Sequence, residues 1–253
     1  MKTLLPLFII GFLLIAASYP KDMYVDERTS TEVFFTTTDN MFPKHWYGNQ
    51  INAEAQSLDR TERLRVIFIL DKAFEKYPET VLKNELDRVY VLKSLKFYGV
   101  SYGGTNSKNT VYLADDGNNP FYTNHFIEGV FHHEFSSVLL RTYANLLDEE
   151  VWEAINSSHF IYGNGGVIAI LNGEASVALD TKLFALGFLT KYSESAIEED
   201  INVFAQNLFN GGHEFWEAVD AHKKIRKKAT LLIDFYNHID PAFTESYFRK
   251  ISN

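Results

Sequence analysis

The chain has 253 residues, of which 24 are basic and 33 are acidic, and its formal net charge is −9. Nucleic acid and anionic membrane surfaces repel a protein of this charge, so neither is an expected partner. The sequence contains no cysteine, which excludes disulfide bonds and a lipid-modified N-terminal cysteine. Hydrophobic residues make up 46% of the chain, so an ordinary core is expected to stabilise the fold.

The first 18 residues have the features of a secretory signal peptide. Lys2 gives a positive start, residues 4–17 are mostly apolar, and Ala-Ala-Ser at residues 16–18 is a small-residue cleavage site. The apolar run is shorter than the roughly 17–25 residues of a membrane-spanning helix and contains Pro6. We therefore expect a mature protein, residues 19–253, that is periplasmic or extracellular and has no stable membrane anchor.

The mature chain begins with a segment that predicts little regular structure. Residues 19–50 are polar and rich in turn-forming residues, so an irregular lead-in is expected there. Apolar residues at helical spacing then predict a helix over residues 61–77, which Pro78 ends. A second, short helix is expected over residues 79–84.

A small β-sheet is expected next, followed by helices. Two β-rich stretches, residues 89–100 and 109–113, are separated by residues 102–107, whose two glycines and asparagine are typical of a hairpin loop. Further helices are expected over residues 123–147, from residue 148, after a capping box at residues 195–198, and over residues 215–236. The sequence therefore predicts a single α+β domain with a mostly helical C-terminal half.

Residues 131–139, Phe-His-His-Glu-Phe-Ser-Ser-Val-Leu, contain most of the zinc-protease motif His-Glu-x-x-His. His133 and Glu134 match its first two positions, and Ser137 stands where the second histidine belongs. Catalytic zinc is normally held by three protein ligands, and the two histidines of this helix turn supply two of them. Because a serine hydroxyl is a poor zinc ligand, the motif alone leaves open whether the chain is an enzyme.

Helical geometry places these side chains on different sides of the expected helix. Glu134 shares an inward arc with apolar residues, namely Ile127, Val130, Phe131 and Val138. A carboxylate on an apolar face is costly, so Glu134 should be partnered or functional. His133 and Ser137 lie at the edge of that arc, one turn apart, as two metal ligands on a helix would. The opposite side carries His125, His132 and Ser136.

A second candidate segment runs from Leu-Thr-Lys-Tyr at residues 189–192 to Glu199, at the start of another helix. Glu198 and Asp200 flank Glu199, and acidic residues are favoured in a first helical turn by the helix dipole. Glu198 is interpreted in this way, as an acidic residue that favours the helix start.

The order of these segments resembles the gluzincin metallopeptidases, in particular the zinc-binding metallopeptidases of bacterial surface lipoproteins and the lethal-factor-like proteases. The resemblance covers roughly residues 86–208 and implies a zincin fold. It implies that His133 and Glu199 bind one zinc ion. It also implies that Glu134 is the general base acting on zinc-bound water and that Tyr192 stabilises the oxyanion.

The sequence departs from the family pattern at Ser137, at Val203, where relatives often carry a second acidic residue, and in having no lipobox cysteine. Zinc is therefore expected to bind weakly or not at all unless another residue replaces the missing ligand. The candidates for that replacement are His132, His159, His213, His222 and His238.

Three functions stay open at this point. The first is a secreted or periplasmic zinc metallopeptidase that acts on a peptide or protein substrate. The second is a catalytically degenerate zincin that binds a peptide or glycan without cleaving it. The third is a structural protein of the export pathway.

Overall fold

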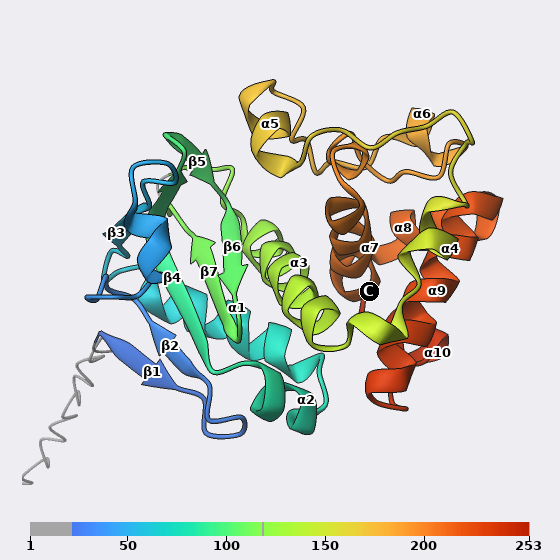
Figure 1. Cartoon of the computed structure of the whole chain (residues 1–253). Helices are drawn as coiled ribbons and strands as arrows, with labels where there is room; N and C mark the ends of the chain where they lie inside the picture. Colours follow the sequence, from blue (N-terminus) through green and yellow to red (C-terminus); the bar gives the residue numbers. More distant parts are fainter. Residues whose placement is uncertain (1–21, 118, 253) are drawn as a thin grey trace, which may run out of the picture.

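The computed structural model describes residues 22–117 and 119–252 (Figure 1). The expected signal peptide lies outside these residues. A β-sheet with two helices lies at one side of the molecule and a group of helices at the other, with helix α3, Asn124–Thr142, between them (Figure 1). No helix in the described ranges is long and apolar enough to cross a membrane.

The sheet has seven strands, of which five form the order β1-β2-β4-β7-β6, while β3 and β5 pair with β4. Strand β4 runs parallel to β2 and β7, and β6 runs antiparallel to β7 at the edge of the sheet. The strands are β1 Met23–Val25, β2 Glu32–Phe34, β3 Glu54–Ser57, β4 Arg88–Phe97, β5 Val100–Tyr102, β6 Gly104–Ser107 and β7 Thr110–Ala114.

Two expectations about this region are wrong. The lead-in over residues 19–50 contains β1, β2 and the 3-10 helix η1, Lys44–Tyr47. Residues 102–107, expected as a hairpin loop, contain the last residue of β5 and the whole of β6, and the chain reverses after them at Lys108, which has a φ of 45°. Turn-forming residues occur both within residues 102–107 and after them, around Lys108. The pairing of β6 with β7 places the turn at Lys108.

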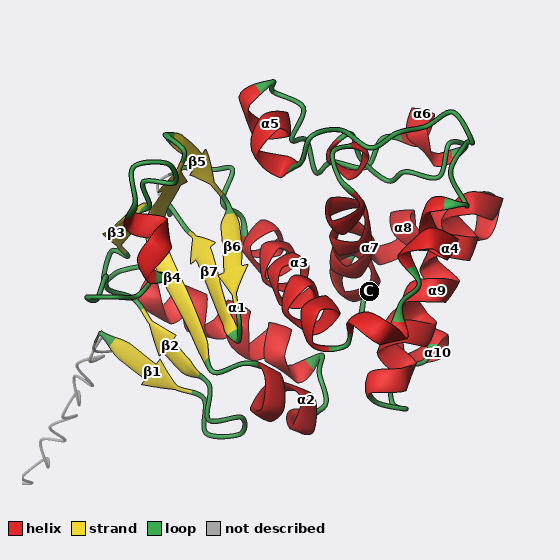
Figure 2. Cartoon of the chain, in the orientation of Figure 1, coloured by secondary structure: helices red, strands yellow, loops and turns green. Residues whose placement is uncertain are grey.

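The helices are α1 Arg63–Glu75, α2 Glu79–Glu85, α3, η2 Ala144–Leu146, α4 Glu149–Glu153, α5 Gly166–Leu171, α6 Thr181–Phe184, η3 Tyr192–Glu194, α7 Ile197–Asn210, α8 Gly212–Ala221, α9 Lys223–Ile239 and α10 Glu245–Ile251. Figure 2 shows the helical C-terminal half beside the sheet. The expected helices over residues 61–77, 79–84 and 123–147 are confirmed within a few residues, and a helix follows Asp148 as predicted.

Two helix predictions need correction. The single helix expected over residues 215–236 is two helices, because His222 has an extended backbone and packs its ring against Phe184 at 5.5 Å. The capping box at residues 195–198 is absent. Ser195 Oγ donates to Tyr192 O at 2.7 Å, and Ala196 caps α7 without a side-chain bond.

Helix α3 is buried on more than one side. It lies between the sheet and α7 (Figure 1), and its side chains on opposite sides, such as Phe131 and Ser136, are both fully buried. The side opposite Glu134 therefore faces other parts of the protein. There His132 Nδ1 and the Tyr77 hydroxyl form a hydrogen bond of 3.0 Å, and the His132 ring stacks on Phe209.

A buried ion pair holds the C-terminal helices together. Lys228 Nζ of α9 lies 2.6 Å from Asp200 Oδ2 of α7, and both side chains are fully buried. The same carboxylate oxygen accepts hydrogen bonds from Trp152 Nε1 at 2.9 Å and the Tyr162 hydroxyl at 2.8 Å. Lys228 also donates to Gly187 O at 2.9 Å. Asp200 is thus part of the core as well as of the acidic first turn.

We predict that Lys228→Met destabilises the protein by about 3–5 kcal/mol, because it leaves the Asp200 carboxylate buried without its counter-charge. Urea unfolding measures the loss, with Lys227→Met, at an exposed neighbouring lysine, as the matched control. Adding Asp200→Asn should recover part of the stability. A Lys228→Met variant as stable as the control would contradict the prediction.

Candidate active site and binding cleft

Three elements bring the predicted site residues together. His133, Glu134 and Ser137 lie on α3, Tyr192 begins η3, and Glu199 lies in the first turn of α7. Because α3 packs along α7 (Figure 2), the first turn of α7 faces the middle of α3. Residues 66 positions apart in the chain are therefore in direct contact.

His133 and Glu199 form the centre of this cluster. His133 Nε2 lies 3.0 Å from Glu199 Oε2, and the His133 ring stacks beside Tyr192 with the centroids 6.1 Å apart. Burial lowers the pKa of His133, but the hydrogen bond to Glu199 and the surrounding carboxylates outweigh burial and raise the pKa above its usual value. The two side chains that the resemblance assigns to zinc are thus adjacent and electrostatically coupled.

Glu134 is partly buried beside His133 and reaches the edge strand β6. Its Oε2 accepts a hydrogen bond from Asn106 Nδ2 at 2.6 Å. Gly104 allows this approach, because a Cβ there would lie 2.5 Å from Val130 and 3.0 Å from Glu134. Burial raises the pKa of Glu134 to about 7, against the opposing effects of His133 and Asn106. A carboxyl group with this pKa can accept or donate a proton at neutral pH.

Tyr192 faces the same cluster. A Cβ added to Gly166 would overlap both the Tyr192 hydroxyl and the Glu199 carboxylate, which places these two groups together beneath the start of α5. Burial, followed by the charges of Glu199 and Glu134, raises the pKa of Tyr192. The hydroxyl therefore keeps its proton and is a hydrogen-bond donor at neutral pH.

Ser137 takes part in a separate hydrogen-bonded network. Its hydroxyl donates to Glu198 Oε1 at 2.8 Å and accepts from Asn202 Nδ2 at 2.7 Å, and only 2% of the residue is exposed. The interpretation of Glu198 as a helix-start residue alone missed this contact, and Asn202 was not predicted. The sequence does hold one signal, since Asn202 follows Glu198 by four residues on the same side of α7.

The donor set does not fit a three-ligand catalytic zinc. His133 and Glu199 could supply two ligands, but the position of the motif's second histidine is occupied by the Ser137 hydroxyl, whose bonds already go to Glu198 and Asn202. Among the described residues, no group of three or more His, Asp or Glu side chains is arranged to hold a metal ion.

The proposed replacement ligands lie elsewhere. His132 contacts Tyr77, His213 pairs with Glu217 in solvent, and His222 packs on Phe184. His159 is exposed, and His238 Nδ1 is bonded to its own helix at Asp234 O. Val203, where the resemblance led us to look for a second acidic residue, is buried in the core.

A cleft of about 270 Å³ opens beside the cluster. His133, Glu134 and Tyr192 form its polar end. Its remaining wall is largely apolar and aromatic, and consists mainly of Tyr102, Phe121, Tyr122, Phe126, Val130, Ile170 and Val177. The Tyr102 hydroxyl is buried without a hydrogen-bond partner in the described part of the chain. The cleft thus combines an apolar surface with a few convergent polar groups, which is typical of ligand sites.

A search of solved structures found a crystal structure of a putative zinc-binding metallo-peptidase from Bacteroides caccae. The two chains have a TM-score of 0.57 and 14% sequence identity, over 89% of this chain and 87% of that chain. At this identity the likeness shows the fold alone, and the expected α+β, zincin-like fold is confirmed. Scans against protein-family models and curated proteins gave no match.

We predict that Glu134→Gln is at least as stable as the wild type at pH 7 in metal-free buffer. The raised pKa means that the folded state binds the proton more tightly than the unfolded chain. Its stabilising contribution is complete below the unfolded pKa, about 4.3, and is lost as the pH rises through about 7. Glutamine stays neutral and still accepts a hydrogen bond from Asn106.

Urea unfolding of the wild type and Glu134→Gln across this pH range measures the effect, with Glu214→Gln, at an exposed glutamate, as the control. The advantage of Glu134→Gln over the wild type should grow as the pH rises. A strongly destabilised Glu134→Gln would show that the carboxylate is ionised and paired in the folded protein.

Proposed function

We propose that this chain is a peptide-binding protein with a metallopeptidase fold, in which the hydrolytic metal site has become a hydrogen-bonded polar cluster. One observation carries the proposal: the Ser137 hydroxyl, at the position of a zinc ligand, is bonded to both Glu198 and Asn202. A buried polar group with its hydrogen bonds made is stable without a metal. The cleft beside it is retained.

The shape of the cleft supports a peptide as the ligand. Strand β6 is at the edge of the sheet, and Gly103 and Gly104 line the cleft, so an extended peptide can add its main-chain hydrogen bonds there. The aromatic wall then receives an apolar side chain of the peptide. His133, with its raised pKa, and the Tyr192 hydroxyl offer hydrogen-bond donors to a peptide carbonyl or carboxylate.

Zinc-dependent peptide hydrolysis is a second candidate. It is favoured by the convergence of His133 and Glu199 within 3.0 Å, beside Glu134 and Tyr192. In that case His133 and Glu199 would be the zinc ligands, Glu134 the general base and Tyr192 the oxyanion donor. The resemblance to the gluzincins would then apply to the chemistry as well as to the order of the segments.

The test measures whether the wild type retains or cleaves the members of a library of extended peptides. It is done once with a metal chelator and once with added zinc. We expect peptides with a large apolar side chain to be retained intact under both conditions. Phe121→Ala, at a 60% exposed position in the cleft, should weaken retention by about tenfold through the lost aromatic contact. Phe68→Ala, at a 54% exposed position outside the cleft, should not.

A Ser137→His variant in the same assay separates the two candidates. Zinc titration should show weak binding to the wild type and a gain well above 10-fold in Ser137→His, which Glu199→Ala then removes. Zinc-dependent cleavage by the wild type would replace the binding proposal with hydrolysis. Absence of both retention and cleavage under every condition would overturn both.

We also propose that the protein acts outside the cytoplasm, as a periplasmic or extracellular protein. The support is the signal-like sequence of residues 1–18 and the absence of cysteine. N-terminal sequencing of the exported protein should give a start near Tyr19, and retention of Met1 would exclude the proposal.

A further inference from the structure

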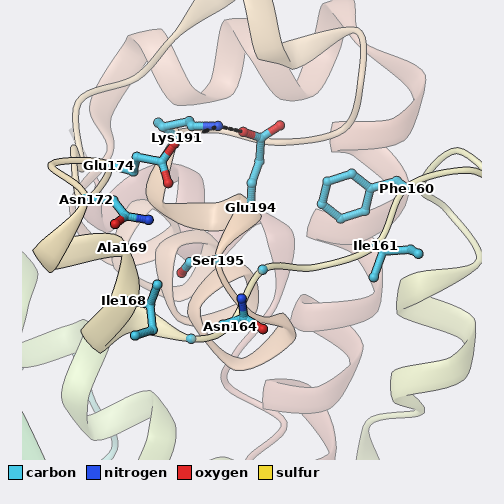
Figure 3. A pocket seen from close by; sticks show the side chains of 12 residues that line it. Phe160, Ile161, Asn164, Ile168, Ala169, Asn172, Glu174, Lys191, Glu194 and Ser195 are labelled. Carbon is cyan, nitrogen blue, oxygen red and sulfur yellow. Dashed lines mark hydrogen bonds and ion pairs between the residues drawn. The ribbon is translucent and has the colours of Figure 1, made fainter.

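A second cavity, of about 310 Å³, lies on the other side of α5 from the cleft. Its size is at the lower end of the roughly 300–1,000 Å³ that is usual for small-ligand sites. Figure 3 shows Asn172 and Glu174 on one side, Phe160 and Ile161 on the opposite side, and Lys191 with Glu194 along a third edge. Helix α5 contributes Ile168 to this cavity and Ile170 to the cleft.

The walls of this cavity are fixed by ring packing outside it and by backbone hydrogen bonds between residues that line it. The ring of Phe160 packs against Phe188, with the centroids 4.5 Å apart, and against Tyr162 at 5.0 Å. Gly163 N donates to Glu194 O at 3.0 Å, and Gly165 N donates to Ser195 O at 2.9 Å. The cavity is therefore formed before any ligand enters.

Two side-chain amides in the cavity have unused hydrogen-bonding capacity. Within the described part of the chain, the amide groups of Asn164 and Asn172 have no hydrogen-bond partner, and both residues are exposed to the cavity and solvent. Each amide offers two donors and an acceptor. Across the cavity from these amides lies an apolar surface that includes Ile161, which is 86% exposed.

The charges disfavour an anionic ligand. Lys191 Nζ lies 2.8 Å from Glu194 Oε2 and 3.8 Å from Glu174 Oε1, so its charge is already compensated. With two carboxylates and one ammonium group, the cavity carries a net negative charge. A peptide backbone is also disfavoured here, because the N–H groups of Gly163 and Gly165 are already used.

We propose that this cavity binds a neutral saccharide unit. A pyranose ring has a C–H face that can pack on Phe160 and Ile161, and hydroxyl groups that both donate and accept. Such hydroxyls match the amides of Asn164 and Asn172 and the carboxylate oxygens of Glu174 and Glu194 that do not contact Lys191. The site is separate from the peptide cleft and stands independently of the function proposed for that cleft.

The experiment is calorimetric titration of the full mature chain with a panel of neutral disaccharides made of glucose, galactose, mannose or N-acetylglucosamine. At least one should bind saturably in the millimolar range. Asn164→Ala and Asn172→Ala should each weaken binding roughly fivefold, the effect of one hydrogen bond between neutral groups. Ile161→Ser should also weaken it through the lost apolar contact.

Asn145→Ala is the matched control, since Asn145 is an exposed asparagine that lines neither the cleft nor this cavity. The uronic acid counterpart of the bound sugar should bind more weakly than the neutral form. The proposal is overturned if no neutral disaccharide binds, or if Asn164→Ala and Asn172→Ala bind as the control does. Tighter binding of the uronic acid would also overturn it.

Discussion

The buried ion pair between Asp200 and Lys228 fixes the position of the first turn of α7, and the candidate site depends on that position. The pair joins α7 to α9, and the bonds from Trp152 and Tyr162 tie the same carboxylate to α4 and to the chain that follows it. A charge pair without access to water tolerates little displacement, because separating the partners leaves each charge uncompensated. The residues before Asp200 are therefore held in one orientation against α3.

Three successive carboxylates then serve three purposes. Side chains on a helix point about 100° apart from one residue to the next, so Glu198, Glu199 and Asp200 face different surroundings. Glu198 accepts from Ser137, Glu199 contacts His133, and Asp200 pairs with Lys228. Helix-dipole stabilisation applies to all three, but the packing of α7 between α3 and α9 gives each carboxylate a separate role.

The sequence was sufficient to predict the features that depend on the spacing of residues within a single helix. A helix over most of residues 123–147, the adjacency of His133 and Ser137 on it, and the position of Glu134 on the face that carries Val130 all follow from helical periodicity. The contact of Ser137 with Glu198 and Asn202 depends on how α7 crosses α3, which periodicity within either helix does not contain. For the same reason Ser195 looked like a helix cap, although its hydroxyl is bonded to Tyr192 O.

The Ser137 network and a third zinc ligand are alternatives at one place in the fold. A histidine at position 137 would take away the acceptor of the buried Asn202 amide, and leaving such a donor unpaired costs about 1–3 kcal/mol. It would also release Glu198 from its hydrogen bond, adding a free carboxylate beside Glu199 and Glu134. Metal binding would have to offset both effects. The hydrogen bonds of Ser137 therefore occupy the place that a third zinc ligand would need, while the neighbouring cleft, whose wall includes residues of β5, β6, α3 and α5 but not Ser137, does not depend on position 137.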